Sequence, residues 1–431
     1  MHGMSSLSKP VLVAASLRRS ANSITTRALN SKIQDYFVTT HPGAESVLAK
    51  ELSEIVGTTT SIEVGKAGVR FQGNDADAYT VSLWSRSAIR VLGLIQEIDL
   101  DPTIPAGDSI YEAFANAALD WGLWLGNKDA SFSIDSRIWG NSNFTNSQLL
   151  NTRARDAICD AVRNARGYKP MPPPKGRVAD VPIFATSFSD RLSIYLDYSG
   201  RSLHKRGFAS TKVHKASLNE CVAATCLHLA GFPDMLKQGH VTVVDPMCGG
   251  GTFLTEAAMM AGNIAPGLYR RYWPFFSWPT FDKKMWDEKV LHAKDSRVKE
   301  KPQVQFFGND IHAGALELAA ENIRGAGVQS LVKLSCSDVR DFRIPNTPVS
   351  LVITNPPWGQ RLMDDSDLED VWGSLRMFLK DQAVEPYDAY ILSGSTEWTK
   401  YLKLRADKKH PLSIGGTDCR LLQYSILKKR T

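Results

Sequence analysis

The chain has 431 residues, of which 43% are hydrophobic and 22% are charged. This length and composition indicate two or three globular domains and exclude collagen-like, coiled-coil and fully disordered chains. No apolar run approaches the roughly 20 residues of a membrane-spanning helix, so we expect no membrane partner. The six cysteines include no CxxC pair, which argues against a disulfide framework or a zinc site and favours a reducing compartment.

Residues 1–34 are basic and contain no acid. They contribute +5 of the formal net charge of +6 and leave +1 for the remainder, so the bulk charge gives no evidence for a nucleic-acid partner. A segment rich in Ser and Arg and free of acid predicts an organellar transit peptide, for a plastid or a mitochondrion. The alternative is a disordered tail without a targeting role, which would leave the protein cytoplasmic.

Residues 35–200 alternate short strands with helices. The apolar periodicity predicts strands at 36–40, 62–64, 69–71, 130–136 and 192–196, and helices at 44–55, 76–88 and 149–165. The prolines at 170–174 indicate a surface loop. We therefore expect two small α+β units, at residues 35–100 and 101–200.

The rest of the chain, residues 201–431, alternates strand and helix regularly. Strands are predicted at 241–245, 305–309, 331–336, 351–354, 389–392 and 421–427, and helical spacing recurs between them. This alternation is typical of a mostly parallel sheet that is covered by helices on both faces.

The strongest local motif is DPMCGGGT, at residues 245–252. A buried strand ends in an acid, and a glycine turn then leads into a helix whose first N–H groups are free to meet a ligand. The dinucleotide fingerprint fits poorly because it needs a glycine at Leu254, and no Lys-Ser or Lys-Thr follows to make a phosphate loop. Alone, the motif is also compatible with an ordinary structural turn.

Three further strands end in polar groups. Asn309-Asp310 follows the second strand, Ser337-Asp338 the third and Asn355-Pro356-Pro357-Trp358 the fourth. A single acid at a strand end is usually a helix cap. Four such ends in succession predict a ligand site at the carboxyl edge of the sheet.

The order DPMCGGGT, ND, SDV and NPPWG resembles the class I S-adenosylmethionine-dependent methyltransferases that modify an exocyclic base nitrogen. With LHKRGF and SLNE upstream and TTHPGAESVLAKEL near the start, the chain is more narrowly similar to the THUMP-containing ribosomal RNA guanine-N2 methyltransferases. The resemblance covers about residues 35–427. It implies an α/β fold, in which a Rossmann-like class I methyltransferase domain with a mostly parallel seven-stranded sheet (201–431) follows a ferredoxin-like region (35–100) and a THUMP RNA-binding domain (101–200).

The resemblance also implies how S-adenosylmethionine is held. The methionine end would lie at the glycine loop, the ribose hydroxyls at Asp310 and the adenine amine at Asp338, with carboxylates accepting from hydroxyl and amine donors. The residues of the glycine loop in this role are Asp245, Cys248, Gly249, Gly250, Gly251 and Thr252. No metal is implied.

The NPPW motif can be interpreted chemically. An exocyclic amine is a poor nucleophile because its lone pair is delocalised into the ring. The Asn355 side-chain oxygen and the Pro356 carbonyl are predicted to accept its two protons, Pro356 and Pro357 to fix the backbone, and Trp358 to stack on the base. The alternative is a merely rigid turn. Many members of the family that the chain resembles carry Tyr in place of Trp358. Stacking survives this change, but a phenolic hydroxyl does not.

Two segments are candidates for RNA contact. The acid-free strip 201–215 predicts a phosphate track, although such strips are usually solvated linkers. Its candidate residues are Arg201, Lys205, Arg206, Lys212 and Lys215. Aromatic residues at 272–286 either stack on unpaired bases or, as we favour for most of them, pack this insertion against its own domain.

The sequence thus predicts an RNA methyltransferase that forms N2-methylguanosine in large-subunit ribosomal RNA. Alternatives are guanine-N2 methylation of tRNA, adenine-N6 methylation, and an inactive RNA-binding ribosome assembly factor. The NPPW motif cannot distinguish guanine from adenine, because both carry an exocyclic amine.

Overall fold

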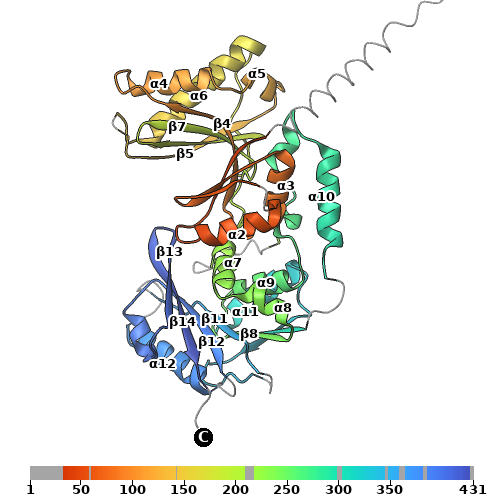
Figure 1. Cartoon of the computed structure of the whole chain (residues 1–431), viewed down its shortest axis with the longest axis vertical. Helices are drawn as coiled ribbons and strands as arrows, with labels where there is room; N and C mark the ends of the chain where they lie inside the picture. The colour runs from red at the N-terminus through yellow and green to blue at the C-terminus, as the bar shows by residue number, and fades with distance from the viewer. Residues whose placement is uncertain are drawn as a thin grey trace, which may run out of the picture.

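The computed structural model describes residues 33–57, 60–141, 143–208, 218–298, 303–344, 348–358, 365–381 and 386–427. These residues contain two seven-stranded sheets, with strand orders β2-β3-β1-β4-β7-β6-β5 and β10-β9-β8-β11-β12-β14-β13. In Figure 1 the first sheet lies in the upper half of the molecule and the second in the lower half. No helix in the described part of the chain is long and apolar enough to cross a bilayer.

The first sheet runs continuously through both predicted α+β units. β4 pairs in antiparallel fashion with β1 on one side and with β7 on the other. Its strands are β1 (Gln34–Thr39), β2 (Ile62–Gly65), β3 (Gly68–Gly73), β4 (Arg90–Asp99), β5 (Phe132–Trp139), β6 (Val181–Phe188) and β7 (Arg191–Asp197). Its helices are α2 (Glu45–Val56), α3 (Asp75–Trp84), α4 (Ala106–Ala115), α5 (Trp121–Trp124) and α6 (Ser147–Arg166). The predicted strands are confirmed, and β4 and β6 are additional.

The predicted helix at 76–88 is shorter in the structure. Asn74 caps α3 by accepting from the backbone N–H groups of Ala76 and Asp77, and the Asp77 side chain accepts from the Asn74 N–H in return. The helix ends at Trp84, and Ser85 is extended. The apolar pattern that predicted a longer helix continues because residues 85–88 turn into the interior, where all four are buried.

The second sheet has the predicted, mostly parallel arrangement. β8 (Val241–Asp245), β9 (Val304–Asp310), β10 (Val332–Cys336), β11 (Leu351–Thr354) and β12 (Tyr387–Ser393) are parallel, whereas β14 (Thr417–Ile426) pairs in antiparallel fashion with β12 and with β13 (Lys408–Ile414). Strand β13 was not predicted, because it is an edge strand that begins with two exposed lysines and contains a proline.

Helices cover both faces of this sheet. Val243, Phe306 and Ile353 pack on the face covered by α7 (Glu220–Leu229), α8 (Phe232–Gln238), α9 (Thr252–Ala261) and α11 (Ala313–Gly325). Val244 and Val352 pack on the opposite face, against α12 (Asp365–Asp381). The polar strand ends therefore lie at an edge between two apolar layers.

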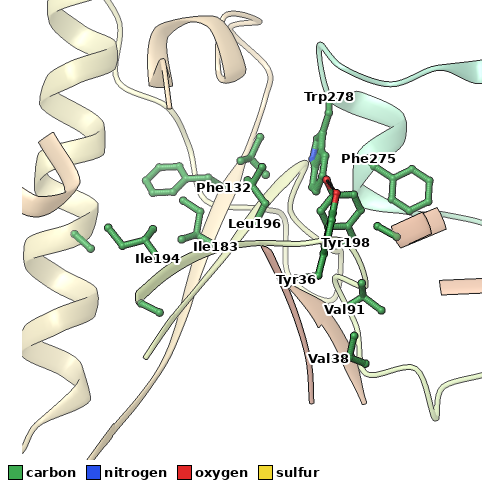
Figure 2. Close-up of a cluster of buried hydrophobic side chains, with 14 of the residues drawn as sticks. Tyr36, Val38, Val91, Phe132, Ile183, Ile194, Leu196, Tyr198, Phe275 and Trp278 are labelled. Carbon is green, nitrogen blue, oxygen red and sulfur yellow. Dashed lines mark hydrogen bonds between the residues drawn. The ribbon is translucent and has the colours of Figure 1, made fainter. Parts of the chain in front are cut away.

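The insertion after α9 returns to the first sheet. It contains the 3-10 helices η1 (Pro266–Tyr269) and η2 (Pro274–Ser277) and the helix α10 (Lys283–Asp295). Figure 2 shows Phe275 and Trp278 beside Tyr36 and Tyr198, and the Tyr198 and Trp278 ring centroids are 4.7 Å apart. Trp273, Phe275, Trp278 and Trp286 are buried in this core. They fill the interior rather than present faces to bases, as the favoured interpretation predicted, but the surface they pack on belongs to the N-terminal sheet.

A buried ion cluster joins the two halves. Arg206 Nε donates to Glu256 Oε1 at 3.0 Å, and its Nη2 donates to the Arg86 carbonyl at 2.8 Å. Arg86 lies 3.7 Å from Glu256 and donates to the Ile264 carbonyl at 2.7 Å. All three ionic side chains are buried. Arg206 is thus not part of a phosphate track, because the residue is 1% exposed and its guanidinium is already paired.

We expect Glu256→Gln to lower the free energy of unfolding by about 3–5 kcal/mol, because the substitution leaves two buried guanidinium groups without their shared carboxylate. Chemical denaturation measures the effect. Glu288→Gln is the matched control, since Glu288 belongs to an exposed pair with Lys284 at 3.8 Å and its loss should change little. Equal stability of the two variants would show that the cluster does not hold the halves together.

Candidate active site

The four predicted strand ends meet at one edge of the second sheet. β10, β9, β8 and β11 are adjacent and parallel, and Asp245 pairs with Gly308 while Cys336 pairs with Asp310. The glycine loop, Asn309-Asp310, Ser337-Asp338 and the NPPW motif therefore lie side by side. The predicted convergence is confirmed, although the role of each residue remains a prediction.

The glycine loop is fixed by backbone contacts. Gly251 adopts φ 72° at the start of α9, and a Cβ there would lie 3.0 Å from the Cβ of Ala319 on α11. The Gly249 N–H donates to Asp310 Oδ2 at 2.9 Å, and Asn322 Nδ2 donates to the Gly250 carbonyl at 3.0 Å. Apart from its two neighbours, no atom of the described residues lies within 4 Å of a Cβ built on Gly249. Hydrogen bonds with Asp310 and Asn322 thus hold the loop in place, and the space next to Gly249 is open.

Cys248 has a packing role in this loop. Its side chain is 7% exposed, and burial raises the pKa of its thiol well above the ordinary value. A buried neutral thiol is a poor nucleophile, so Cys248 supports the loop by its size.

Asn309 is a residue whose role the sequence did not reveal. It is 1% exposed. Its Nδ2 donates to the carbonyls of Pro246 at 3.2 Å and Ser337 at 3.0 Å, and its Oδ1 accepts from Ser337 Oγ at 2.9 Å. One side chain therefore ties together the loops that follow β8, β9 and β10. Its only sequence signal was its position before Asp310.

Asp245 is a buried carboxyl group at the end of β8. Burial raises its pKa to about 7, and the nearby Asp310 carboxylate adds to the shift. Its Oδ1 accepts from the Met247 N–H at 3.2 Å. Near neutral pH this group is poised between its protonated and ionised forms.

Asp310 and Asp338 differ in their surroundings. Asp310 accepts only backbone N–H groups within the described residues, from Gly249 and from His312 at 2.9 Å. Asp338 is paired with Arg340. Its Oδ1 accepts from Arg340 Nε at 3.0 Å and its Oδ2 from Arg340 Nη2 at 2.7 Å, and these hydrogen bonds hold the pKa of the Asp338 carboxyl below the usual range. Asp310 keeps more free acceptor capacity than Asp338.

The NPPW turn holds its own asparagine. Trp358 Nε1 donates to Asn355 Oδ1 at 2.8 Å, and Trp372 Nε1 donates to the Pro357 carbonyl at 3.0 Å. The Trp358 ring lies against the backbone of Gly394, where a Cβ would come within 2.4 Å of it. The indole thus orients the Asn355 amide while using one of its two oxygen lone pairs.

Two family models match the chain. The "RlmL ferredoxin-like domain" matches residues 35–92, and "RMKL-like, methyltransferase domain" matches residues 209–423. The chain therefore carries an RMKL-like methyltransferase domain behind an RlmL ferredoxin-like domain. The strand order of the second sheet agrees with the class I methyltransferase fold that the sequence predicted.

Named relatives support this assignment. Proteins called "Ribosomal RNA large subunit methyltransferase K/L" from Photobacterium profundum and Syntrophotalea carbinolica are 34% identical over 404 residues and 32% identical over 399 residues. The matches cover 91% and 92% of this chain but 53% and 54% of those proteins, so the chain spans about half the length of the curated relatives it matches.

Solved structures share the whole architecture. A possible methylase from Clostridium difficile 630 has a TM-score of 0.76 at 25% identity and covers 93% of this chain and 100% of its own. SMU.472, a putative methyltransferase determined in complex with SAH, has a TM-score of 0.76 at 26% identity and covers 93% of this chain and 99% of its own.

A groove of about 1380 Å³ lies between the N-terminal sheet and the methyltransferase sheet. Arg201 and Lys205, two of the predicted RNA-binding residues, are exposed and line it, together with Arg177 and Arg271. Lys212 and Lys215 lie outside the described residues. Thr252 and Asn322 also line the groove, so it reaches the base of the glycine loop.

Within the described ranges no group of three or more His, Cys, Asp or Glu side chains could hold a metal.

The raised pKa of Asp245 leads to a prediction about how the stability of the chain depends on pH. Between the ordinary Asp pKa of 3.8 and about 7, the folded chain keeps a proton that the unfolded chain releases, so Asp245 lowers stability as pH rises through this window. Asp245→Asn removes the effect. In denaturation without ligand, the stability of the variant relative to wild type should rise by up to about 4 kcal/mol between pH 4 and pH 8. A constant difference would mean that Asp245 titrates normally.

Proposed function

We propose that this chain transfers a methyl group from S-adenosylmethionine to the exocyclic N2 of a guanine in large-subunit ribosomal RNA. The observation that carries the proposal is the Asn355 amide, held by Trp358 at the strand end beside the glycine loop. The names of the K/L relatives and the SAH complex of SMU.472 support the same assignment.

The residues at the strand ends fit S-adenosylmethionine. The open space above Gly249 admits a ligand close to the backbone. Asp310 has acceptor sites left for ribose hydroxyls, and Asp338 has one left for an adenine amine. Ile311, which is 60% exposed, offers an apolar surface for the adenine ring beside Asp310. When bound, S-adenosylmethionine supplies an electrophilic methyl group on a positively charged sulfur.

The chain's own residues prepare the nucleophile. Asn355 Oδ1 and the Pro356 carbonyl accept hydrogen bonds from the two N–H groups of the amine, which draws the nitrogen toward a pyramidal shape and directs its lone pair at the methyl group. An asparagine is not a strong base, so catalysis rests on position and on preorganised acceptors. The N2–methyl bond forms as the carbon–sulfur bond breaks, and the surplus N2 proton passes to solvent.

The groove between the two sheets is the proposed path for the RNA. Arg177, Arg201, Lys205 and Arg271 are exposed along it, and Tyr272 adds a partly exposed ring. Cationic side chains bind phosphates and aromatic faces stack on unpaired bases. The target base has to leave its stack or lie in a loop to reach Asn355.

The activity is tested with the full chain, labelled S-adenosylmethionine and transcribed large-subunit ribosomal RNA or tRNA, followed by mass analysis of nucleosides. N2-methylguanosine in the ribosomal RNA is expected. N6-methyladenosine, or labelling confined to tRNA, would replace the proposal by the corresponding alternative. Binding of S-adenosylmethionine without any transfer would point to an assembly factor.

Asn355→Ala should reduce kcat at least about 10²-fold, the effect typical of losing one preorganised polar group, while S-adenosylmethionine affinity by calorimetry stays close to wild type. Asp310→Ala is the matched variant with the opposite expectation. It should weaken S-adenosylmethionine binding by roughly 10- to 100-fold, because charge-assisted hydrogen bonds are removed. Unchanged kinetics of Asn355→Ala would remove this residue from the mechanism.

Trp358→Phe retains an aromatic face but removes the N–H that holds Asn355. Since one hydrogen bond contributes about 1 kcal/mol, kcat should fall several-fold to roughly 10-fold, with little change in KM for RNA. A rise in KM with kcat intact would show instead that the ring matters for binding the base alone.

We also propose that residues 1–34 direct the protein to a plastid or mitochondrion. The absence of acid and the +5 charge support this, and the matched region begins at residue 35. A fluorescent protein fused behind residues 1–34 should enter one of these organelles. Diffuse cytoplasmic fluorescence would contradict the proposal.

A further inference from the structure

A second pocket lies on the other side of the NPPW turn from the glycine loop. It has a volume of about 720 Å³ and is formed by the end of β12, the segment at residues 395–406 and the β13–β14 hairpin. Leu422 and Tyr424, both buried, line it. Neither the motifs nor the proposed RNA groove includes any of its residues.

The pocket is strongly cationic. Lys400, Arg405, Lys409 and Arg420 line it and are exposed, against one acid in the lining, Asp418. The strand register explains why two of these cations are together. Lys409 pairs with Leu422, and the next position on the same face pairs Pro411 with Arg420, so Lys409 and Arg420 are diagonal neighbours on one face of the hairpin.

The positive charge is not neutralised by the protein itself. Among the described residues, no ion pair joins any of the four cations to a carboxylate. Some other surface cations are paired, since Lys237, Lys283 and Arg340 each lie beside an acid. Four unpaired cations around a pocket repel one another and favour an anionic ligand.

The pocket adjoins the catalytic turn directly. Gly394 lines it and also contacts the Trp358 ring, so tightly that no side chain fits between them. The turn that carries Gly394 is fixed, because Ser393 Oγ accepts from the Ser395 N–H at 3.1 Å and donates to the Ser395 carbonyl at 2.9 Å. Only the backbone of Gly394 therefore lies between this cationic pocket and Trp358, the residue that holds Asn355.

We propose that this pocket binds a backbone phosphate of the RNA strand next to the target nucleotide. The inference rests on the proposed function, because it assigns the anion to the substrate of the same site. A nucleotide whose base is turned toward Asn355 carries its own phosphates on the far side of the base from the methyl donor. Cations placed there hold the strand while the base is out of its stack.

The test uses Arg405→Gln/Arg420→Gln in the full chain, with transcribed large-subunit ribosomal RNA as the probe. RNA affinity should fall at least about 10-fold. The slope of log affinity against log salt should decrease by about 0.7 for each single-strand phosphate that the variant no longer neutralises. KM for RNA should rise with S-adenosylmethionine affinity unchanged. Arg405→Gln alone, at an exposed position, tests the pocket if the double variant fails to fold.

Lys408→Gln is the matched control. Lys408 is exposed and adjacent to Lys409 but lies on the opposite face of β13, because it pairs with Gln423. Affinity and salt slope should stay as in wild type. If the pocket variants bind RNA as well as Lys408→Gln does, the pocket has no phosphate role, whatever the activity of the wild type. If the wild type transfers no methyl group yet these substitutions weaken its RNA binding, the proposed function fails and the phosphate pocket stands.

Discussion

The buried ion cluster of Arg86, Glu256 and Arg206 fixes how the two sheets face each other. Arg86 comes from the turn before β4, Arg206 from the segment between the sheets, and Glu256 from α9, the helix that starts at the glycine loop. Glu51 on α2 accepts from the backbone N–H of Arg86 at 2.6 Å, so the cluster holds two buried cations and two buried acids. Moving the sheets apart would leave these charges unpaired in the interior, which costs several kcal/mol. The glycine loop therefore keeps a fixed position relative to the N-terminal sheet.

The aromatic insertion after α9 also fixes the two sheets relative to each other, through apolar contacts. Phe275 and Trp278 are carried by the methyltransferase part of the chain, yet they complete the core around Tyr36 and Tyr198 (Figure 2). The N-terminal sheet thus depends on the methyltransferase part of the chain for part of its interior, which ties the two sheets together. An RNA that binds in the groove between them has to adapt its own shape, which agrees with recognition through a loop or an extruded base.

Much of the methyltransferase sheet was predictable, because a buried parallel strand is a short apolar run and its end is marked by the first polar residue. The first and last residues of β8 and β11 were predicted correctly. The meeting of Asp245, Asp310 and Asn355 at one edge of the sheet was also predicted. Edge strand β13 was not predicted because it has one buried residue, Leu412, and therefore no apolar run. Arg206 was misassigned because its partner Glu256 is 50 positions away, and a pairing at that separation leaves no local pattern. The Trp358 contact with Asn355 was missed for another reason, since ring orientation depends on Gly394 in the next strand's turn.

The NPPW turn separates two regions that suit different ligands. On the side of β8 to β10, backbone N–H groups and carboxylates surround an open space and suit a ligand with hydroxyl and amine donors. On the side of β12 to β14, unpaired cations suit a phosphate. Asn355 lies between the two, and Trp358 and Gly394 restrict its amide to one orientation. A reaction that needs a lone pair aimed at a methyl carbon gains most from such an arrangement, because the reacting groups are positioned from opposite directions and the one acceptor between them cannot turn away.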